Sequence, residues 1–409
     1  MTDLERILPM WRELETAGAD YVLATVVGVE GSSYRKPGTC MLVAPDGRRA
    51  GTVSGGCLEA QVASRAWWLT SDGPTVQRYS TAEEDGNRPF GSGCGGVVSL
   101  LLERRATAGS FLTAMAQAFD RRVPMAVATV LDGPQIGRRA FAGLQAPSLG
   151  APPKEGAPSL RRPFVARVGE NELESAGGPG LDSETRGGPN PDSPVYRGLQ
   201  NLAARALRAR ISLEESTTGQ GTEFRIWANY FPARPGLCIF GAGDDAQPLL
   251  RLARELGWFV TVADGRSHLA TRNRFPQANV VVVLGTPGFP ELRPTDAAVL
   301  LTHSFEQDVR ILASLLGQDN PPAYIGVLGP QRRTREALAE AATLLEIPAS
   351  NTTIEGWMAH LHSPVGLDLG ADSPETIALS VLAEIQQSIT AATALPLSQV
   401  RADLLTSPT

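Results

Sequence analysis

Residues 237–266 read LCIFGAGDDAQPLLRLARELGWFVTVADGR, two apolar strands joined by a glycine turn and an amphipathic helix. Gly241, Gly243 and Ala246 form a G-x-G-x-x-A turn between the first strand and the helix. Such glycines allow a tight turn and a close approach of the backbone to a phosphate at the helix N-terminus. Asp264 ends the second strand about twenty residues later, where a ribose-binding acid is expected. The stretch predicts a Rossmann-like unit and leaves open whether it binds a nucleotide.

The same alternation of strands and helices continues towards the C-terminus. Further apolar runs, NVVVVLG, AAVLLTH and AYIGVLG, are separated by amphipathic helical segments. Continuous Val, Ile and Leu strands between helices are typical of a parallel sheet that is covered on both faces. We therefore predict an α/β doubly wound domain over residues 234–395, followed by a tail over 396–409. Its final helix is expected to begin with Ser373 as the cap and Pro374 in the first position.

Ligands of open α/β sheets bind outside the carboxyl ends of the strands. The candidates at this edge are Gly241–Asp245, Asp264, Arg266, Gly285, His303, Gly329, Arg332 and Arg333. A histidine and two arginines suit an anionic ligand, although each of them could equally cap a helix or face solvent. Two observations weigh against a dinucleotide: Asp244 and Asp245 add negative charge where a pyrophosphate would dock, and Pro248 lies in the first helical turns.

The N-terminal part predicts a second, mixed α/β domain over residues 1–144. A helix is expected over 3–18 and a buried strand over 21–29, followed by a hairpin that turns at Asp46-Gly47. The segment 145–193 is rich in Pro, Gly and Ser and predicts a mobile insertion. Residues 194–233 are expected to form a connecting helix and strand before the Rossmann-like domain. The chain thus predicts an N-terminal mixed α/β domain followed by a doubly wound parallel sheet.

Two cysteines of the N-terminal domain are set between glycines. Cys57 lies in GTVSGGCLE (51–59), at the opening of a predicted helix, and Cys94 lies in GSGCGG (91–96). A thiol in the first helical turn faces unpaired N–H groups and the positive end of the helix dipole, and both favour the thiolate. The alternative is a small buried side chain, which is the usual role of a free cysteine.

A nearby basic segment, GSSYRKPG (31–38), gathers two hydroxyls with Arg35 and Lys36 between glycines. This composition suits an anion cradle, and a solvated basic loop is the commoner alternative.

Composition excludes several classes of protein. The net charge of −6 offers no electrostatic reason for nucleic-acid binding. No apolar run approaches the roughly 18 residues that span a bilayer, and the acidic start is unlike a signal peptide. The four cysteines, without a secretion signal or C-x-x-C spacing, indicate reduced thiols, a cytoplasmic location and no zinc site.

Seven motifs occur in order over most of the chain. They are GSSYRKPGTCMLV, GTVSGGCLE, GCGGVVSLLLE, LCIFGAGDDAQPLLRLARELGWFVTVADGR, LLTHSFEQDV, AYIGVLGPQRR and VGLDLGADSPETIALSVLAEI. In series they resemble the XdhC/CoxI family of accessory proteins for molybdenum hydroxylases such as xanthine dehydrogenase. The resemblance covers roughly residues 5–105 and 225–390. It implies a homodimeric chaperone, not an enzyme, that binds the molybdenum cofactor (molybdopterin), supports its sulfuration with a cysteine desulfurase, and inserts it into a xanthine-dehydrogenase-type molybdoenzyme.

The resemblance also implies the site residues. Cys57 and Cys94 fall in the family's glycine-rich cysteine motifs and are candidate contacts to molybdenum or its terminal sulfur, because soft thiolates suit such partners. The sequence departs from many relatives at Asp244, where they carry histidine, which puts in doubt which molybdoenzyme is served. The candidate cofactor-binding set is Cys57, Cys94, Ser32, Ser33, Arg35, Lys36, Gly55, Gly56, Gly95, Gly241, Gly243, Asp244, Asp264, His303 and Arg332.

Two rival functions stay open at this point. The first is an NAD(P)-dependent oxidoreductase that uses Gly241, Gly243 and Asp264, although no Tyr-x-x-x-Lys or similar hydride-transfer set accompanies them. The second is a redox or regulatory module in which Cys57 and Cys94 form a reversible disulfide.

Overall fold

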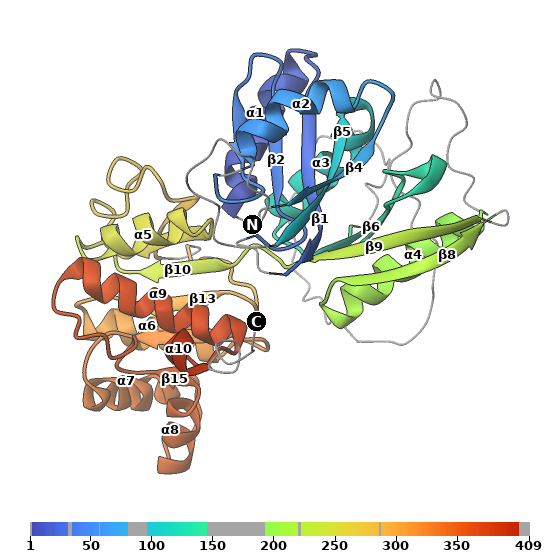
Figure 1. Ribbon diagram of the computed structural model, residues 1–409. Helices are drawn as coiled ribbons and strands as arrows, with labels where there is room; N and C mark the ends of the chain where they lie inside the picture. The colour runs from blue at the N-terminus through green and yellow to red at the C-terminus, as the bar shows by residue number, and fades with distance from the viewer. Residues whose placement is uncertain are drawn as a thin grey trace, which may run out of the picture. The chain divides into compact units, whose positions relative to one another are not determined.

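The computed structural model of the chain describes residues 2–31, 35–56, 58–80, 96–144, 193–219, 222–285 and 288–400 (Figure 1). The chain divides into two compact units, with the boundary between Ala233 and Arg234. The predicted insertion over 145–193 lies outside the described residues, except for Ser193.

The first unit begins with a five-stranded antiparallel sheet in the order β3-β2-β1-β5-β4. Its strands are β1 (Val22–Glu30), β2 (Cys40–Val43), β3 (Arg49–Gly51), β4 (Thr75–Ser80) and β5 (Val97–Arg104). The hairpin between β2 and β3 turns at the predicted Asp46-Gly47 pair. Asp46 accepts a hydrogen bond from the N–H of Arg48 (2.9 Å), and Gly47 supplies a φ of +86° that favours glycine.

Helices cover both faces of this sheet. They are α1 (Thr2–Thr16), α2 (Glu59–Leu69) and α3 (Arg105–Arg121). Successive side chains of a strand point to opposite faces, so Leu23 of β1 packs with α1 and α3, whereas Val22 and Ala24 pack with α2. The sheet is therefore buried on both sides, which explains why β1 reads as a continuous apolar run.

A second sheet completes the first unit, in the order β7-β6-β9-β8. Its strands are β6 (Met125–Val130), β7 (Arg139–Ala142), β8 (Leu213–Gly219) and β9 (Thr222–Phe231), with a 3-10 turn at Gly133–Gln135. Helix α4 (Pro194–Ala209) packs on it through Leu199, Leu202 and Ala206. The segment 194–233, expected from the sequence as a connection, thus supplies one helix and two strands to this sheet.

The second unit contains a six-stranded parallel sheet in the order β12-β11-β10-β13-β14-β15. Its strands are β10 (Gly236–Phe240), β11 (Phe259–Asp264), β12 (Val280–Val283), β13 (Ala297–Leu300), β14 (Tyr324–Val327) and β15 (Leu361–His362). Numbered from β10, this order is that of a dinucleotide-binding fold, with the topological switch between β10 and β13. The predicted Rossmann-like sheet is confirmed.

Helices again cover both faces of the parallel sheet. They are α5 (Ala246–Glu255), α6 (Phe305–Leu316), α7 (Gln331–Leu344), α8 (Asn351–Met358), α9 (Pro374–Thr390) and α10 (Leu397–Val400). Helices α5 and α9 share one apolar core, and α6 and α7 share the other. As predicted, α9 begins with Ser373 as the cap, whose hydroxyl accepts from the N–H of Thr376, and with Pro374 in the first turn.

Candidate functional site

The loops that carry the predicted N-terminal motifs leave the first sheet at the same end. β1 ends at Glu30, which pairs with Val97, the first residue of β5. β2 begins at Cys40, and β3 ends beside it at Gly51. Because neighbouring strands are antiparallel, the connections that follow β1, β3 and β4 all emerge at one end of the sheet. These connections contain the motifs at 31–38, 51–59 and 91–96.

The carboxylate of Glu59 organises the glycine turn before α2. Its Oε1 accepts hydrogen bonds from the backbone N–H groups of Val53 (3.0 Å), Ser54 (2.9 Å) and Gly55 (3.1 Å). Its Oε2 accepts from the N–H of Gly56 (2.9 Å) and from the hydroxyl of Ser54 (2.8 Å). One buried carboxylate therefore satisfies four backbone donors of the turn. Sequence reasoning missed this role, although an acid in the first turn of a helix is expected to interact with the unpaired N–H groups there.

Hydrogen bonding keeps this carboxylate charged. Burial by itself would raise the pKa of Glu59, but the hydrogen bonds from Ser54, Gly55 and its own N–H group outweigh burial and lower the pKa to about 2. The N–H groups of the turn thus already have an anionic partner. The phosphate of a ligand would have to displace Glu59 to reach them.

Gly38, the last residue of the basic segment, lies against both sheets of the first unit. The N–H of Gly38 donates to the carbonyl of Val26 (2.7 Å), and a side chain on Gly38, whose φ is +95°, would collide with the amide of Asn229. Two candidate residues belong to this segment. Arg35 forms an ion pair with Asp3, with 3.7 Å between Nη1 and Oδ2, and Lys36 is exposed. Two cationic side chains therefore lie at the end of the sheet where the glycine turn emerges.

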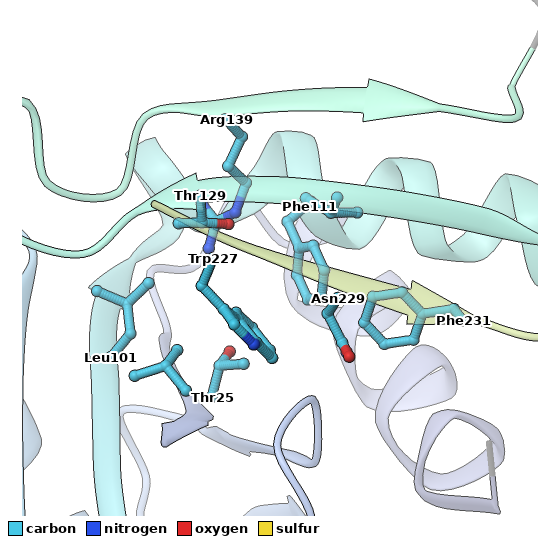
Figure 2. Close-up of a pocket in the computed structure, with 10 residues that line it drawn as sticks. Thr25, Leu101, Phe111, Thr129, Arg139, Trp227, Asn229 and Phe231 are labelled. Carbon is cyan, nitrogen blue, oxygen red and sulfur yellow. The ribbon is translucent and has the colours of Figure 1, made fainter. Parts of the chain in front are cut away.

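A small cavity lies between the two sheets of the first unit (Figure 2). Most of its lining is apolar, and Thr25, Thr129, Arg139 and Asn229 add polar groups to it. Its volume is about 10 Å³, which suits a single water molecule. The cavity is far too small for a pterin, so the surface at the strand ends is the better candidate for a cofactor.

In the second unit, Asp264 is buried and supports the glycine turn. Its Oδ2 accepts from the N–H of Ala242 (2.7 Å), and Arg266 donates to both carboxylate oxygens at 3.0 and 2.8 Å. Burial would raise the pKa of Asp264, but the hydrogen bonds from Arg266 and Ala242 lower it overall. The side chain is 0 % exposed. A ribose could therefore reach this predicted acid only if Arg266 moved away.

The two glycines of this turn have different surroundings. Gly241 has a φ of +117°, and a Cβ there would lie 2.8 Å from the carbonyl oxygen of Leu301. Gly243 faces open space, with no atom within 4 Å of an added Cβ. Packing of the turn thus requires Gly241, whereas Gly243 leaves the backbone accessible to a ligand.

Charged side chains lie along the carboxyl edge of the parallel sheet, two of them at the amino end of α5. Asp244 is 94 % exposed and pairs with Arg274 (2.8 Å). The carboxylate of Asp245 lies 3.9 Å from the exposed ring of His303. Arg332 is 90 % exposed, with Glu336 3.8 Å away. The carboxyl edge brings these predicted residues to one rim, but its two aspartates oppose a diphosphate at the helix N-terminus.

The cysteines of the described residues are not reactive ones. Cys40 and Cys238 are free and buried, and burial raises the pKa of Cys40 to about 11 and that of Cys238 well above its usual value. Within the same part of the chain, no three His, Cys, Asp or Glu side chains gather into a metal site. None of the helices there combines the length and apolarity needed to cross a membrane. Five candidates lie outside the described residues: Ser32, Ser33, Cys57, Cys94 and Gly95.

Comparison with known proteins assigns both units to one family. Residues 14–80 match the model of the XdhC and CoxI family, and residues 237–385 match that of the XdhC Rossmann domain. The chain is 31% identical over 376 residues to a probable subunit of xanthine dehydrogenase from Bacillus subtilis, covering 90% of this chain and 92% of that protein. The chain belongs to the XdhC and CoxI family.

Two further proteins are similar to this chain, one over part of its sequence and one in its structure. The molybdenum cofactor insertion chaperone PaoD of Escherichia coli is 34% identical over 129 residues, which cover 31% of this chain and 39% of PaoD. A crystal structure described as a xanthine dehydrogenase from Bacillus halodurans aligns with a TM-score of 0.64 and 26% identity, over 98% of this chain and 100% of that one. The relationship thus extends over both units of the XdhC/CoxI chain.

Proposed function

We propose that this XdhC/CoxI protein is a non-catalytic accessory protein for a xanthine-dehydrogenase-type molybdoenzyme. It binds the molybdenum cofactor, supports its sulfuration and inserts it into the apo-enzyme. The names of two relatives support this proposal, since one is a probable subunit of xanthine dehydrogenase and the other a molybdenum cofactor insertion chaperone. The family relationship to the first extends over 90% of the chain.

The observation that carries the proposal is that three connections, whose sequences contain the N-terminal motifs, leave the five-stranded sheet at the same end. Cys57 and Cys94 belong to two of these motifs, and thiolates are the protein ligands best suited to molybdenum or its terminal sulfur. The third motif supplies Arg35 and Lys36 for the pterin phosphate. We assign the phosphate to these cations rather than to the turn amides, because Glu59 already bonds to the amides.

The proposed role requires protein partners. A cysteine desulfurase would supply the sulfur, and the apo-molybdoenzyme would receive the sulfurated cofactor. We further propose that the protein acts in the cytoplasm as a homodimer, which light scattering of the purified full chain would test.

Pterin analysis tests the proposal directly. The full chain purified from cells that make the cofactor is expected to release a fluorescent oxidised pterin, and Cys57→Ala/Cys94→Ala is expected to lose it. Cys238→Ala is the matched control, because this thiol is buried in β10 and outside the proposed site. A wild-type chain without pterin would refute the function. Undiminished pterin in the double variant would refute the assignment of the cysteines.

A further inference from the structure

We propose that Glu59 is a positioning residue for the Cys57 motif, and that its carboxylate presets the backbone on which the proposed cofactor contact depends. This inference rests on the proposed function. In this proposal Glu59 does not contact the cofactor. It acts through the turn over residues 53–56, whose N–H groups it binds.

The residues on either side of Cys57 belong to one hydrogen-bond network. Before it, the N–H of Gly56 donates to Glu59 Oε2 (2.9 Å). After it, the N–H of Leu58 donates to the hydroxyl oxygen of Ser54 (2.9 Å), and this hydroxyl donates in turn to Glu59 (2.8 Å). Both flanking peptides are therefore tied to the same carboxylate, one directly and one through Ser54.

The backbone conformation of the turn explains why an acid is needed there. Gly55 and Gly56 have φ values of +104° and +125°, a region that favours glycine and that here accompanies N–H groups aimed at a single point. Successive N–H groups of this kind form a nest that attracts an anion. Glu59 supplies that anion from within the chain, at 7% exposure, so the nest is filled by the protein itself.

The turn is also anchored at both ends in the core. Val53 and Leu58 are buried against β1 and α2, whereas Gly55 and Gly56, at the apex, are exposed. Glu59 thus holds the exposed residues Gly55 and Gly56 by hydrogen bonds, while Val53 and Leu58 on either side of them are buried in the core. A site held by such internal bonds keeps its geometry before the ligand arrives, which lowers the entropic cost of binding.

Hydrogen exchange of the full chain tests the network without any cofactor. In Glu59→Gln, the amide group would place a donor opposite other donors, so we expect the N–H groups of residues 53–56 to exchange about tenfold faster or more than in wild type. Glu30→Gln is the matched control, because Glu30 pairs with Arg78 (2.8 Å) at 66% exposure in the same sheet. Unchanged exchange in Glu59→Gln would overturn the proposal.

Cofactor release distinguishes positioning from a merely structural role. At unchanged melting temperature, bound pterin should leave Glu59→Gln about tenfold faster than wild type, whereas the Glu30→Gln control should keep the wild-type rate. Ser54→Ala should repeat the effect and Ser54→Thr, which keeps the hydroxyl, should restore the slow release. This pair also carries the test if Glu59→Gln fails to fold. Faster exchange with unchanged pterin release would overturn the positioning role.

The role of Glu59 can still be tested if the wild-type protein carries no pterin. The proposed function would then fail, and the alkylation rate of Cys57 by iodoacetamide, read by mass spectrometry, would test Glu59 alone. We expect this rate to differ by about fivefold or more between wild type and Glu59→Gln, and not between wild type and Glu30→Gln. Equal rates in all three proteins would overturn the role of Glu59.

Discussion

Arg139 on β7 and Glu103 on β5 form an ion pair that joins the two sheets of the first unit. Arg139 Nη1 lies 2.8 Å from Glu103 Oε1, and Nη2 bonds to the other oxygen. The side chains are only 4% and 0% exposed, and the guanidinium lies 5.1 Å from the ring centre of Phe111. Both charges are buried, so each depends on the other for its stability in the fold.

Removal of one partner should therefore destabilise the first unit. Arg139→Met leaves Glu103 buried and unpaired, and we expect a loss of about 3–5 kcal/mol in the free energy of unfolding. The double variant Glu103→Gln/Arg139→Met should lose less than the single one. Arg310→Met, which breaks an ion pair at 71% and 76% exposure, serves as the control with a change below about 0.5 kcal/mol. Urea unfolding measures all three, and a loss in Arg139→Met as small as in the control would contradict the prediction.

The two glycines of the Rossmann turn should respond differently to the same substitution. Gly241→Ala places a Cβ 2.8 Å from the Leu301 carbonyl at a φ of +117°, and should cost about 2 kcal/mol or more of stability. Gly243→Ala meets no atom within 4 Å and should change stability by less than about 0.5 kcal/mol. Thermal unfolding of the two variants compares them directly. Equal melting temperatures would show that the close approach at Gly241 is not needed.

Substitutions of two aspartates near the same turn, Asp264 and Asp244, should differ in their effect on stability, and the same proteins test nucleotide binding. Asp264→Asn weakens the bonds to Ala242 and Arg266 and should lower stability by about 1–3 kcal/mol. Asp244→Asn, at 94% exposure, should leave it nearly unchanged. Because Asp264 is already bonded within the protein, titration with NAD(H) or NADP(H) at about millimolar concentration should give no saturable binding to wild type. Saturable binding to wild type that Asp264→Asn abolishes would instead favour the dehydrogenase hypothesis.

Acid should destabilise the second unit through Glu384 on α9. Its carboxylate accepts hydrogen bonds from the Tyr324 hydroxyl (2.5 Å) and the Gly366 N–H (2.7 Å), and lies 3.0 Å from His362 Nδ1. Burial would raise the pKa of Glu384, but these hydrogen bonds lower it overall. A lowered folded-state pKa adds stability above the unfolded value of about 4.3, and this stability is lost as the pH falls through the folded-state pKa.

The substitution Glu384→Gln tests this linkage. Urea unfolding from about pH 6 to about pH 3 should show a smaller decline in stability for Glu384→Gln than for wild type, because the variant has no carboxylate to protonate there. Glu306→Gln, at 76% exposure, should follow the wild-type curve. Parallel curves for wild type and Glu384→Gln would remove Glu384 as a source of the acid sensitivity.

Local sequence patterns were sufficient to predict the main strands and helices of the second unit. The strand Gly236–Phe240, the turn at Gly241 and the helix over Ala246–Glu255 are contiguous, and each has a propensity that agrees with its final structure. The same holds for the cap at Ser373. Prediction was weaker in the first unit, where β7 and β8 were not identified. β8 reads LEESTTG, with no apolar alternation, and is a strand because it pairs with β9.

For the candidate site as well, part could be predicted from the sequence and part could not. The residue types at Arg35, Lys36, Gly55 and Gly56 were recognisable from composition and from the family resemblance. Their common location at one end of the sheet follows only from the antiparallel order of the strands. The role of Glu59 was only partly predictable: an acid in the first turn of a helix suggests an interaction with N–H groups, but residue spacing does not reveal that one carboxylate reaches four of them.

The doubly wound parallel sheet with its glycine turn and the resemblance to the XdhC/CoxI family can both be predicted from the amino-acid sequence. These features depend on short-range periodicity and on motif order. The pairing of buried charges becomes visible only in the folded chain: Glu103 pairs with Arg139, Asp264 with Arg266, and Glu59 with the turn amides. Burial of an unpaired charge costs free energy, so each buried acid bonds to donors that the fold places beside it, and these donors can be distant in the sequence.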